Sequence, residues 1–414
     1  MNPQQLRGLE QRLERFLAEM TAPLGREERR HWAGMYTRGL LLDGERKSIE
    51  PLAQRVNGGN VQAMQQFIGQ SPWAAEQVQE LLNRRLDDVL SAATYWLVDE
   101  TSFPKQGKHS VGVARQYCGS LGKIANCQVA VSLHWSTEDF SFPLGWRLYL
   151  PESWVNDTQR RRKSGVPEAI GFQSKPDLGL ALLDQALAWG LRPGIVLSDS
   201  GYGDSYQWRA ALRKRTLTYC VQVEGKTGVW RKAPGRNRMP RPISLTELAR
   251  RLPAKAWRTL TWREGSKGKQ RSRFAMVVVW AAHGWRPGEQ IVRVPETVLI
   301  EWPAGSDQPE KFWLSNLSPK EGLRPLVRTA KARWRIELDY RQLKEELGLD
   351  HFEGRSWLGW HHHVTMVTLA YAFLRLEQAC IKKNGWCDFA SDEATPAAAA
   401  DPPERPLPVV PKPV

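Results

Sequence analysis

Three carboxylates stand at positions from which they could act together on one substrate. Asp99 ends the apolar run YWLVD, and Asp199 ends the apolar run GIVLSD. Acids that follow strands can meet at the edge of a sheet, and Glu337, from a segment with helical spacing, could join them there. Three such carboxylates could bind a pair of Mg²⁺ ions, which activate water and stabilise the leaving oxygen in an in-line phosphoryl displacement. The alternative for each aspartate is that it caps a loop or a helix.

Glu337 lies in the segment RWRIELDYRQLKEELGLDHFEGR, residues 333–355, which holds six carboxylates. Its helical spacing predicts an apolar stripe that faces a core. The members of this stripe are Ile336, Tyr340, Leu343 and Leu347. A second row beside the stripe has one acid among three cations. Its members are Arg333, Glu337, Arg341 and Lys344. One carboxylate for a metal, with cations for phosphate, is what a nuclease-like helix requires, although a solvated row of ion pairs has the same spacing.

The other five acids of this segment are expected to do no chemistry. Asp339 and Glu346 fall on a different helical face, where solvated ion pairs are the simplest interpretation. We expect the same of Glu345, Asp350 and Glu353, because none of them has a cationic flank in register. Glu337 is therefore the one candidate among the six.

Basic residues elsewhere could hold phosphates near the acids. The loop PKQGKHS follows Asp99 and offers Lys105, Lys108 and His109, although a solvated loop would need no function. A run of four cations is a stronger candidate, because consecutive like charges repel unless a polyanion or solvent receives them. These residues are Arg160, Arg161, Arg162 and Lys163.

Three consecutive histidines, His361 to His363, suggest a metal site at first sight. Successive side chains on a helix point about 100° apart, so three in a row do not converge on one ion. With tryptophans nearby, packing and hydrogen bonding are the favoured interpretation.

The elements that must position these residues follow in a clear order. Residues 1–92 are predicted to be a helical DNA-binding domain, with short helices around Gly58-Gly59 that fit a helix-turn-helix-like bundle. Residues 93–223 carry strands that then alternate with helices, which indicates a mixed α/β sheet. Residues 224–318 are strand-rich, residues 319–385 return to helical spacing, and residues 386–414 are Pro-rich and expected to be disordered.

The charge of the 414-residue chain favours a polyanionic partner. Its formal net charge is +15, and residues 209–273 contain nineteen Lys and Arg against three Glu. The five cysteines are odd in number and form no CxxC pair, which argues for a reducing compartment and against a zinc knuckle. The N-terminal segment is charged and amphipathic, and no apolar run reaches transmembrane length. We therefore expect a soluble, cytoplasmic bacterial protein, associated with the nucleoid when on DNA.

The motifs together resemble those of a known family. RWRIELDYRQLK is similar to the signature helix Tyr-x2-Arg-x3-Glu-x6-Lys of insertion-sequence transposases related to the IS4 group, with Arg333, Glu337 and Lys344 in place and Ala330 at the tyrosine position. The segments VDETSFPKQGKHSVGVARQYCG, LYLPESWVND, VLSDSGYG and LKEELGLDHFEGRSWLGWHHH resemble the IS701-type transposases of the DDE superfamily more closely. This resemblance extends over residues 30–380.

The resemblance implies a fold, a metal site and a reaction. The fold is α/β, an RNase H-like catalytic core with a β-rich insertion between the second aspartate and the glutamate. The implied metal-binding triad is Asp99, Asp199 and Glu337, with Mg²⁺ or Mn²⁺, in two ions. The implied reaction is hydrolysis at the ends of the element, followed by attack of the freed 3′-OH on target DNA. The implied partners are double-stranded DNA, at terminal inverted repeats and target, and a second copy of the chain.

Two other functions remain open from the sequence. A structure-selective nuclease such as a junction resolvase could use the same core, although the long basic insertion and the helical N-terminal region favour the transposase. A DNA-binding regulator derived from such a core would not need intact acids at all three positions.

Overall fold

The computed structural model describes residues 2–89, 94–138, 140–233, 241–265, 268–282 and 293–382. The Pro-rich segment 386–414 lies outside these residues. No helix in the described part of the chain combines the length and apolar character needed to span a membrane.

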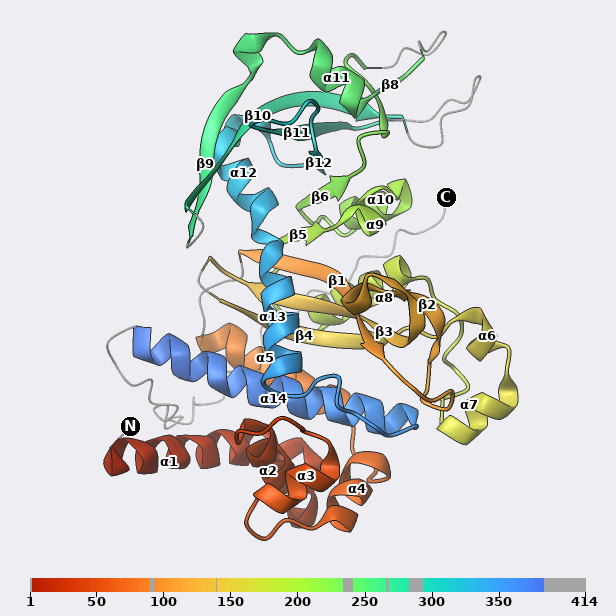
Figure 1. The fold of residues 1–414 in the computed structure, drawn as a ribbon, viewed down its shortest axis with the longest axis vertical. Helices are drawn as coiled ribbons and strands as arrows, with labels where there is room; N and C mark the ends of the chain where they lie inside the picture. The colour runs from red at the N-terminus through yellow and green to blue at the C-terminus, as the bar shows by residue number, and fades with distance from the viewer. Residues whose placement is uncertain are drawn as a thin grey trace, which may run out of the picture.

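The N-terminal helices gather around the long C-terminal helix α14 (Trp357–Lys382), at the bottom of Figure 1. Their bounds are α1 (Pro3–Met20), α2 (Glu27–Leu41), α3 (Ile49–Arg55), α4 (Val61–Gly69) and α5 (Ala75–Val89). Helices α2, α4 and α5 contact α14 directly. The interface contains an ion pair in which Arg12 Nη2 lies 2.7 Å from Glu377 Oε2, with both side chains buried. The helical N-terminal region therefore packs on the last helix of the catalytic half.

The central sheet begins directly after these helices. Its first strands are β1 (Tyr95–Pro104), β2 (Ala114–Cys118), β3 (Lys123–Ser136), β4 (Ser141–Leu148), β5 (Ile195–Ser198) and β6 (Tyr219–Val223). The spatial order is β4-β3-β1-β5-β6, with β3 and β4 antiparallel to their neighbours and β1, β5 and β6 parallel. This is the strand arrangement of an RNase H-like core, so the predicted α/β fold class is confirmed.

Helices cover both faces of this sheet. Because the side chains of a strand alternate between its two faces, the helices on each face contact every second residue of the strand. The intervening helices are α6 (Glu152–Val155), α7 (Thr158–Ser164), α8 (Lys175–Ala188), α9 (Ser200–Gly203) and α10 (Tyr206–Lys214). Helix α8 lies over β1, β3 and β4, and its Gly179 leaves room for Val98 of β1. Because successive side chains of a strand alternate between faces, Asp99 points to the opposite side.

The strand-rich segment continues the same sheet instead of forming a separate one. Its elements are β7 (Gly228–Trp230), β8 (Ile243–Ser244), α11 (Leu245–Arg251), β9 (Arg258–Gly265), β10 (Gly268–Ala281), β11 (Pro295–Pro303) and β12 (Lys311–Ser315). Strand β12 pairs antiparallel with β6, and β11 and β10 follow outward. A second apolar cluster, which includes Val279, Val298 and Ile300, forms between these strands and α11. The insertion is thus joined to the catalytic sheet edge to edge.

Two consecutive helices connect the insertion with the catalytic core. Helix α12 (Leu323–Ala332) contacts β9 and β10 of the insertion, and α13 (Trp334–Glu345) contacts β1, β4 and α14. Figure 1 shows them in line through the middle of the molecule. Arg333 is the junction between them, with helical backbone angles. The predicted apolar stripe of α13 is confirmed, because Ile336, Leu343 and Leu347 are almost fully buried and Tyr340 is also buried.

Candidate active site

Asp99 and Asp199 come together because β5 ends beside the middle of β1. Strand β1 continues for five residues beyond Asp99, so the prediction that Asp99 follows the end of its strand is wrong, whereas Asp199 directly follows the last residue of β5. Strand β1 pairs with β5 so that Leu97 lies beside Leu197. Continuing this register by two residues places Asp99 beside Asp199, at a strand spacing of about 4.8 Å. Asp199 occupies the N-cap position of α9, but its side chain makes no cap hydrogen bond there. A Cβ added at Gly201 would lie 3.1 Å from Asp199 Oδ1, so glycine keeps the space in front of this carboxylate open.

Arg333 connects Asp99 of β1 to Glu337 of helix α13. Its Nη1 donates to Asp99 Oδ2 at 2.6 Å, and its Nη2 donates to Glu337 Oε1 at 2.9 Å. Glu337 is one turn further along the helix, and its side chain is 63% exposed. A guanidinium presents several donors in a fixed plane, so one arginine can hold two carboxylates at once. The charged row of α13 that was predicted from helical spacing is thus connected to Asp99 through Arg333.

Burial raises the pKa values of both aspartates. The pKa of Asp99 rises to about 7, mainly because the carboxyl is buried; Arg333 lowers it, and the nearby charges of Asp199 and Glu100 raise it. Burial also raises the pKa of Asp199, and Arg333 opposes that shift. Two acids that share a site in a low-dielectric environment resist ionising together. A cation bound between them would relieve this repulsion.

The carboxylates fit a divalent cation in chemistry, although Arg333 stands between two of them. Within the described ranges, no three His, Cys, Asp or Glu side chains form a ready-made metal cluster. Asp199 Oδ1 is buried and accepts no hydrogen bond of ordinary geometry among the described residues, although the backbone N–H groups of Gly201 and Tyr202 lie near enough to the carboxylate to lower its pKa. Such an oxygen is costly in a protein interior unless a cation or water meets it. Asp99 and Asp199 therefore fit a divalent cation in chemistry, and Glu337, tied to Asp99 through Arg333, is the third candidate carboxylate.

Asp339, in contrast, was predicted wrongly to meet solvent. It is 1% exposed and accepts three hydrogen bonds: from His134 Nδ1 at 2.7 Å, Ser141 Oγ at 2.8 Å and the Tyr371 hydroxyl at 2.9 Å. We call His134, Ser141, Asp339 and Tyr371 the Asp339 network. It ties α13 to β3, β4 and α14. Helical spacing cannot show this, because the face of α13 beside the apolar stripe is covered by a sheet and another helix.

The cations of α13 differ in their surroundings. Lys344 Nζ donates to the carbonyl of Ser102 at 2.8 Å and lies 5.4 Å from the centre of the Phe103 ring. Burial lowers the pKa of Lys344. Arg341 is exposed. Lys344 thus anchors α13 to β1 close to Asp99, whereas Arg341 faces solvent.

The other predicted phosphate-binding residues are likewise split between structural contacts and the surface. Lys105 Nζ donates to the carbonyl of Phe352 at 2.6 Å, and burial lowers its pKa to about 8. Lys108 and His109 of the same loop are exposed.

The predicted cationic run Arg160–Lys163 falls in helix α7. The guanidinium carbon of Arg160 lies 3.9 Å from the centre of a Trp154 ring, and Arg161 donates to the carbonyls of Val155, Pro167, Glu168 and Ile170. The last two cations of the run, at positions 162 and 163, are exposed.

Two of the three histidines belong to the interface with the N-terminal region. The His362 ring stacks on Trp73 with centroids 3.6 Å apart, and His363 Nδ1 lies 2.9 Å from the Tyr36 hydroxyl. Both histidines are fully buried. The interpretation as packing residues is confirmed for these two.

One charged pair beside the two aspartates was not predicted from the sequence. Lys175, in the first turn of α8, lies 2.6 Å from Glu100 Oε1. Glu100 follows Asp99 directly and points to the α8 face, yet its charge raises the pKa of both aspartates. The adjacency of two acids in VDE was the signal available in the sequence, but only the fold supplies the lysine.

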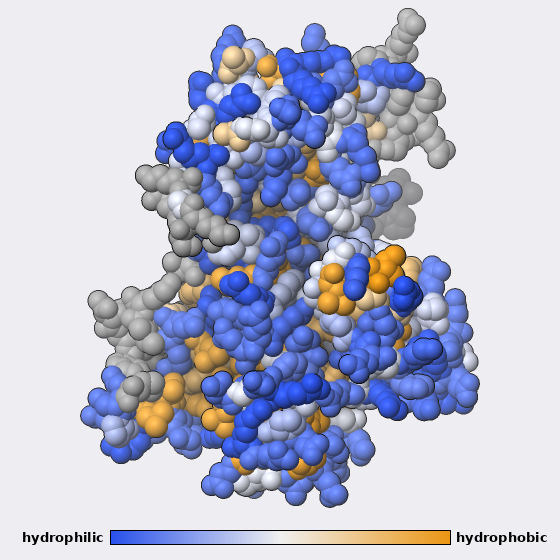
Figure 2. Space-filling model, in the orientation of Figure 1, coloured by the Kyte–Doolittle hydropathy of each residue, from blue (hydrophilic) through white to orange (hydrophobic). Residues whose placement is uncertain are grey.

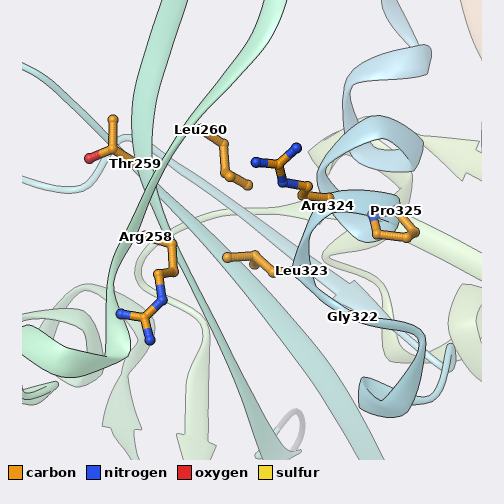
Figure 3. A pocket seen from close by; sticks show the side chains of 7 residues that line it. All are labelled: Arg258, Thr259, Leu260, Gly322, Leu323, Arg324 and Pro325. Atoms are coloured by element: carbon orange, nitrogen blue, oxygen red, sulfur yellow. The ribbon is translucent and has the colours of Figure 1, made fainter.

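A cavity of about 470 Å³ lies between β9 and the start of α12, apart from the three acids. Figure 3 shows Leu260 and Leu323 between the guanidinium groups of Arg258 and Arg324. Its lining holds no carboxylate, so the candidate chemistry is not located there.

Comparison with known families decides what kind of core this is. A family model described as DDE superfamily endonuclease matches residues 19–269, which is more than half of the chain, and one described as Transposase DDE domain matches residues 173–373. The chain belongs to the DDE superfamily of endonucleases. These matches span the strands that carry both aspartates and the helix that carries Glu337.

A curated relative agrees with this family. The DDE chain is 30% identical over 187 residues to the protein named probable transposase for insertion sequence element IS701, from Microchaete diplosiphon. The match covers 45% of this chain and 46% of the relative, so this chain spans about half the length of that relative. The resemblance to IS701-type transposases is thereby confirmed. A solved structure of a piggyBac transposase synaptic complex with hairpin DNA aligns with a TM-score of 0.35 and 12% identity, over 71% of this chain and 49% of that chain.

Proposed function

We propose that this protein is a DNA transposase that cuts DNA at the terminal inverted repeats of an insertion sequence and joins the freed 3′-OH ends to target DNA. Membership of the DDE superfamily and the IS701-type relative support this reaction. The observation that carries the proposal is that Asp199, just after β5, lies beside Asp99 of β1, and that Arg333 links Asp99 to Glu337.

Asp99, Asp199 and Glu337 would hold the two Mg²⁺ or Mn²⁺ ions. When bound, the ions supply activation of the attacking oxygen and charge neutralisation at the leaving oxygen. The chain's own residues prepare the site: burial keeps water from screening the two aspartates, and Arg333 keeps Glu337 beside them. Arg333 and Arg341, with Lys344, are the proposed phosphate ligands of α13. Lys105, Lys108, His109 and the run Arg160–Lys163 are proposed as further phosphate contacts, with the exposed members best able to reach DNA.

The test is Mg²⁺-dependent strand cleavage by single variants. Asp99→Ala, Asp199→Ala and Glu337→Ala should each abolish cleavage while leaving DNA binding largely intact. Glu345→Ala is the matched control, because Glu345 is an exposed acid on the same helix. Cleavage at the wild-type rate by the Glu337→Ala protein would refute the role of that residue.

Two alternatives differ in the products they make. A structure-selective endonuclease with the same core would cut DNA but never join the ends to a target. A regulator that only binds DNA would not cut at all. An assay with a DNA fragment that ends in the inverted repeats, followed by sequencing of any joined product, separates all three.

The proposed partners and organisation follow from the same function. We propose that the chain works on double-stranded DNA as a homodimer that pairs two element ends. In this proposal residues 1–92 form a DNA-binding domain, residues 93–223 and 319–385 form the catalytic core, and residues 224–318 add surface for end recognition. The site of action is the bacterial cytoplasm, on the nucleoid.

A further inference from the structure

An exposed apolar face lies on the hairpin formed by β2 and the first residues of β3. Tyr117 is 63% exposed and Ile124 is 61% exposed, and the strand register places them directly opposite each other. Leu121, in the turn between the strands, is 48% exposed. Figure 2 shows hydrophobic atoms gathered at the right of the molecule, at the level where Figure 1 draws β2. We call Tyr117, Leu121 and Ile124 the hairpin patch.

The surroundings of the hairpin patch are cationic. Arg115 is exposed two residues before Tyr117, on the same face of β2, and Lys123 is exposed at the start of β3, on the opposite face. The sequence has no Asp or Glu from Thr101 to Thr137, a stretch that also contains two further lysines. An apolar face flanked by cations and free of acids matches a partner with apolar rings or sugars inside an anionic backbone.

The hairpin is also fixed close to the acids. Its turn rests on β1, where the Ser120 N–H donates to Ser102 Oγ at 3.1 Å. Ser102 is three residues beyond Asp99, a distance of about 10 Å along β1, and its side chain points to the α8 face, opposite to that of Asp99. DNA advances about 3.4 Å per base pair, so 10 Å corresponds to roughly three base pairs. A duplex whose scissile phosphate sits at Asp99 would reach the hairpin within its first turn.

We infer that the hairpin patch, with Arg115 and Lys123, is a DNA-contacting surface beside the cleavage position. The apolar side chains pack on sugars or on an exposed base, and the two cations meet phosphates. A second copy of this chain is the rival occupant. A two-fold interface would set this cationic face against itself without any acid to balance it, which disfavours that occupant. The inference rests on the proposed function, because it assumes that the substrate is DNA.

The experiment measures the affinity of the full-length protein for a labelled duplex of about 30 base pairs as a function of salt concentration. Two double variants separate the two parts of the surface: Tyr117→Ser with Ile124→Ser, and Arg115→Gln with Lys123→Gln. Leu42→Ser is the control, since Leu42 is 44% exposed at the end of α2, outside the hairpin. Thermal unfolding of each variant verifies that the fold is kept.

The expected results differ for the two double variants. The apolar variant should bind at least about fivefold more weakly at every salt concentration, with the salt slope unchanged. The charge variant should lower the slope of log affinity against log salt by about 1.8, the value for two phosphate contacts. The control should bind like the wild type.

Three outcomes would overturn the inference. If the wild type binds the duplex and both double variants bind equally well, the hairpin is not a DNA contact, and the proposed function stands. If the apolar variant converts a dimer of the free protein into a monomer in sedimentation experiments, the patch is a self-association surface. If the wild type does not bind DNA at all, the proposed function fails together with the inference.

Discussion

The Asp339 network gives the sharpest test of how the active-site helix is held. Asp339 lies two residues from Glu337, on the side of α13 that is covered by β3, β4 and α14. Its carboxylate accepts three hydrogen bonds within 2.9 Å, from His134, Ser141 and Tyr371. Replacement by alanine would remove all three bonds and leave His134 and Ser141 without this acceptor, while the Tyr371 hydroxyl would keep Gln342 Oε1 at 2.9 Å.

The expected magnitude follows from those three bonds. Counting about 1–1.5 kcal/mol for each lost hydrogen bond gives about 3–4.5 kcal/mol for Asp339→Ala. Asp339→Asn keeps one acceptor oxygen but turns an amide toward a donor, so we expect a smaller cost of about 1–3 kcal/mol. Either value is a large part of the roughly 5–15 kcal/mol by which folded proteins are stable.

Urea unfolding of the full chain measures this cost. The Asp339→Ala protein should unfold at a lower midpoint with an unchanged slope, and the Asp339→Asn protein should fall between it and the wild type. Glu345→Ala, exposed on the same helix, should stay within about 0.5 kcal/mol of the wild type. An Asp339→Ala midpoint equal to that of Glu345→Ala would refute the reasoning, because it would mean that the network contributes nothing to holding α13.

Three further predictions concern the core and the site. Burial lowers the pKa of His363 to about 3. As the pH falls, the imidazole is therefore protonated in the unfolded chain before it is protonated in the folded one, and the free energy of unfolding should fall by up to about 1.4 kcal/mol per pH unit below about pH 6.5. A His363→Gln protein should show a shallower decline of the urea midpoint toward acid pH. Lys344→Ala should lower the turnover of DNA cleavage at least about tenfold without changing the Mg²⁺ requirement; unchanged turnover would limit Lys344 to its bond with the Ser102 carbonyl. Arg333→Lys cannot span Asp99 and Glu337 with one planar group, and we expect at least about tenfold slower cleavage at equal DNA affinity; a wild-type rate would contradict the bridging role.

Much of the fold could be predicted from local patterns. The run YWLVD and the run GIVLSD are apolar because parallel strands in the middle of a sheet are buried on both faces. The apolar stripe of α13 was visible because helical periodicity is a property of the sequence itself. The continuation of the catalytic sheet into the insertion, through β6 and β12, was not predictable, because pairing between strands so far apart in the chain leaves no local signal.

The candidate site divides in the same way. The types and spacing of Arg333, Glu337 and Lys344 predict a metal- and phosphate-binding helix, although a solvated row of ion pairs has the same spacing. The structure shows what spacing could not: the lysine bonds a backbone carbonyl, and Lys105, predicted to face a phosphate, bonds another. A long cationic side chain reaches several ångströms, so its partner depends on which strand lies beneath it.

By itself, the sequence determined many of the elements, the two aspartates that close apolar runs, and the one acid among the six of residues 333–355 that stands among cations. Tertiary structure alone decided that Asp99 and Asp199 are neighbours, that Arg333 bridges to Glu337, and that Asp339 is buried. The physical reason is that periodicity tells which residues share a face, whereas burial and charge pairing depend on what the rest of the chain packs against that face.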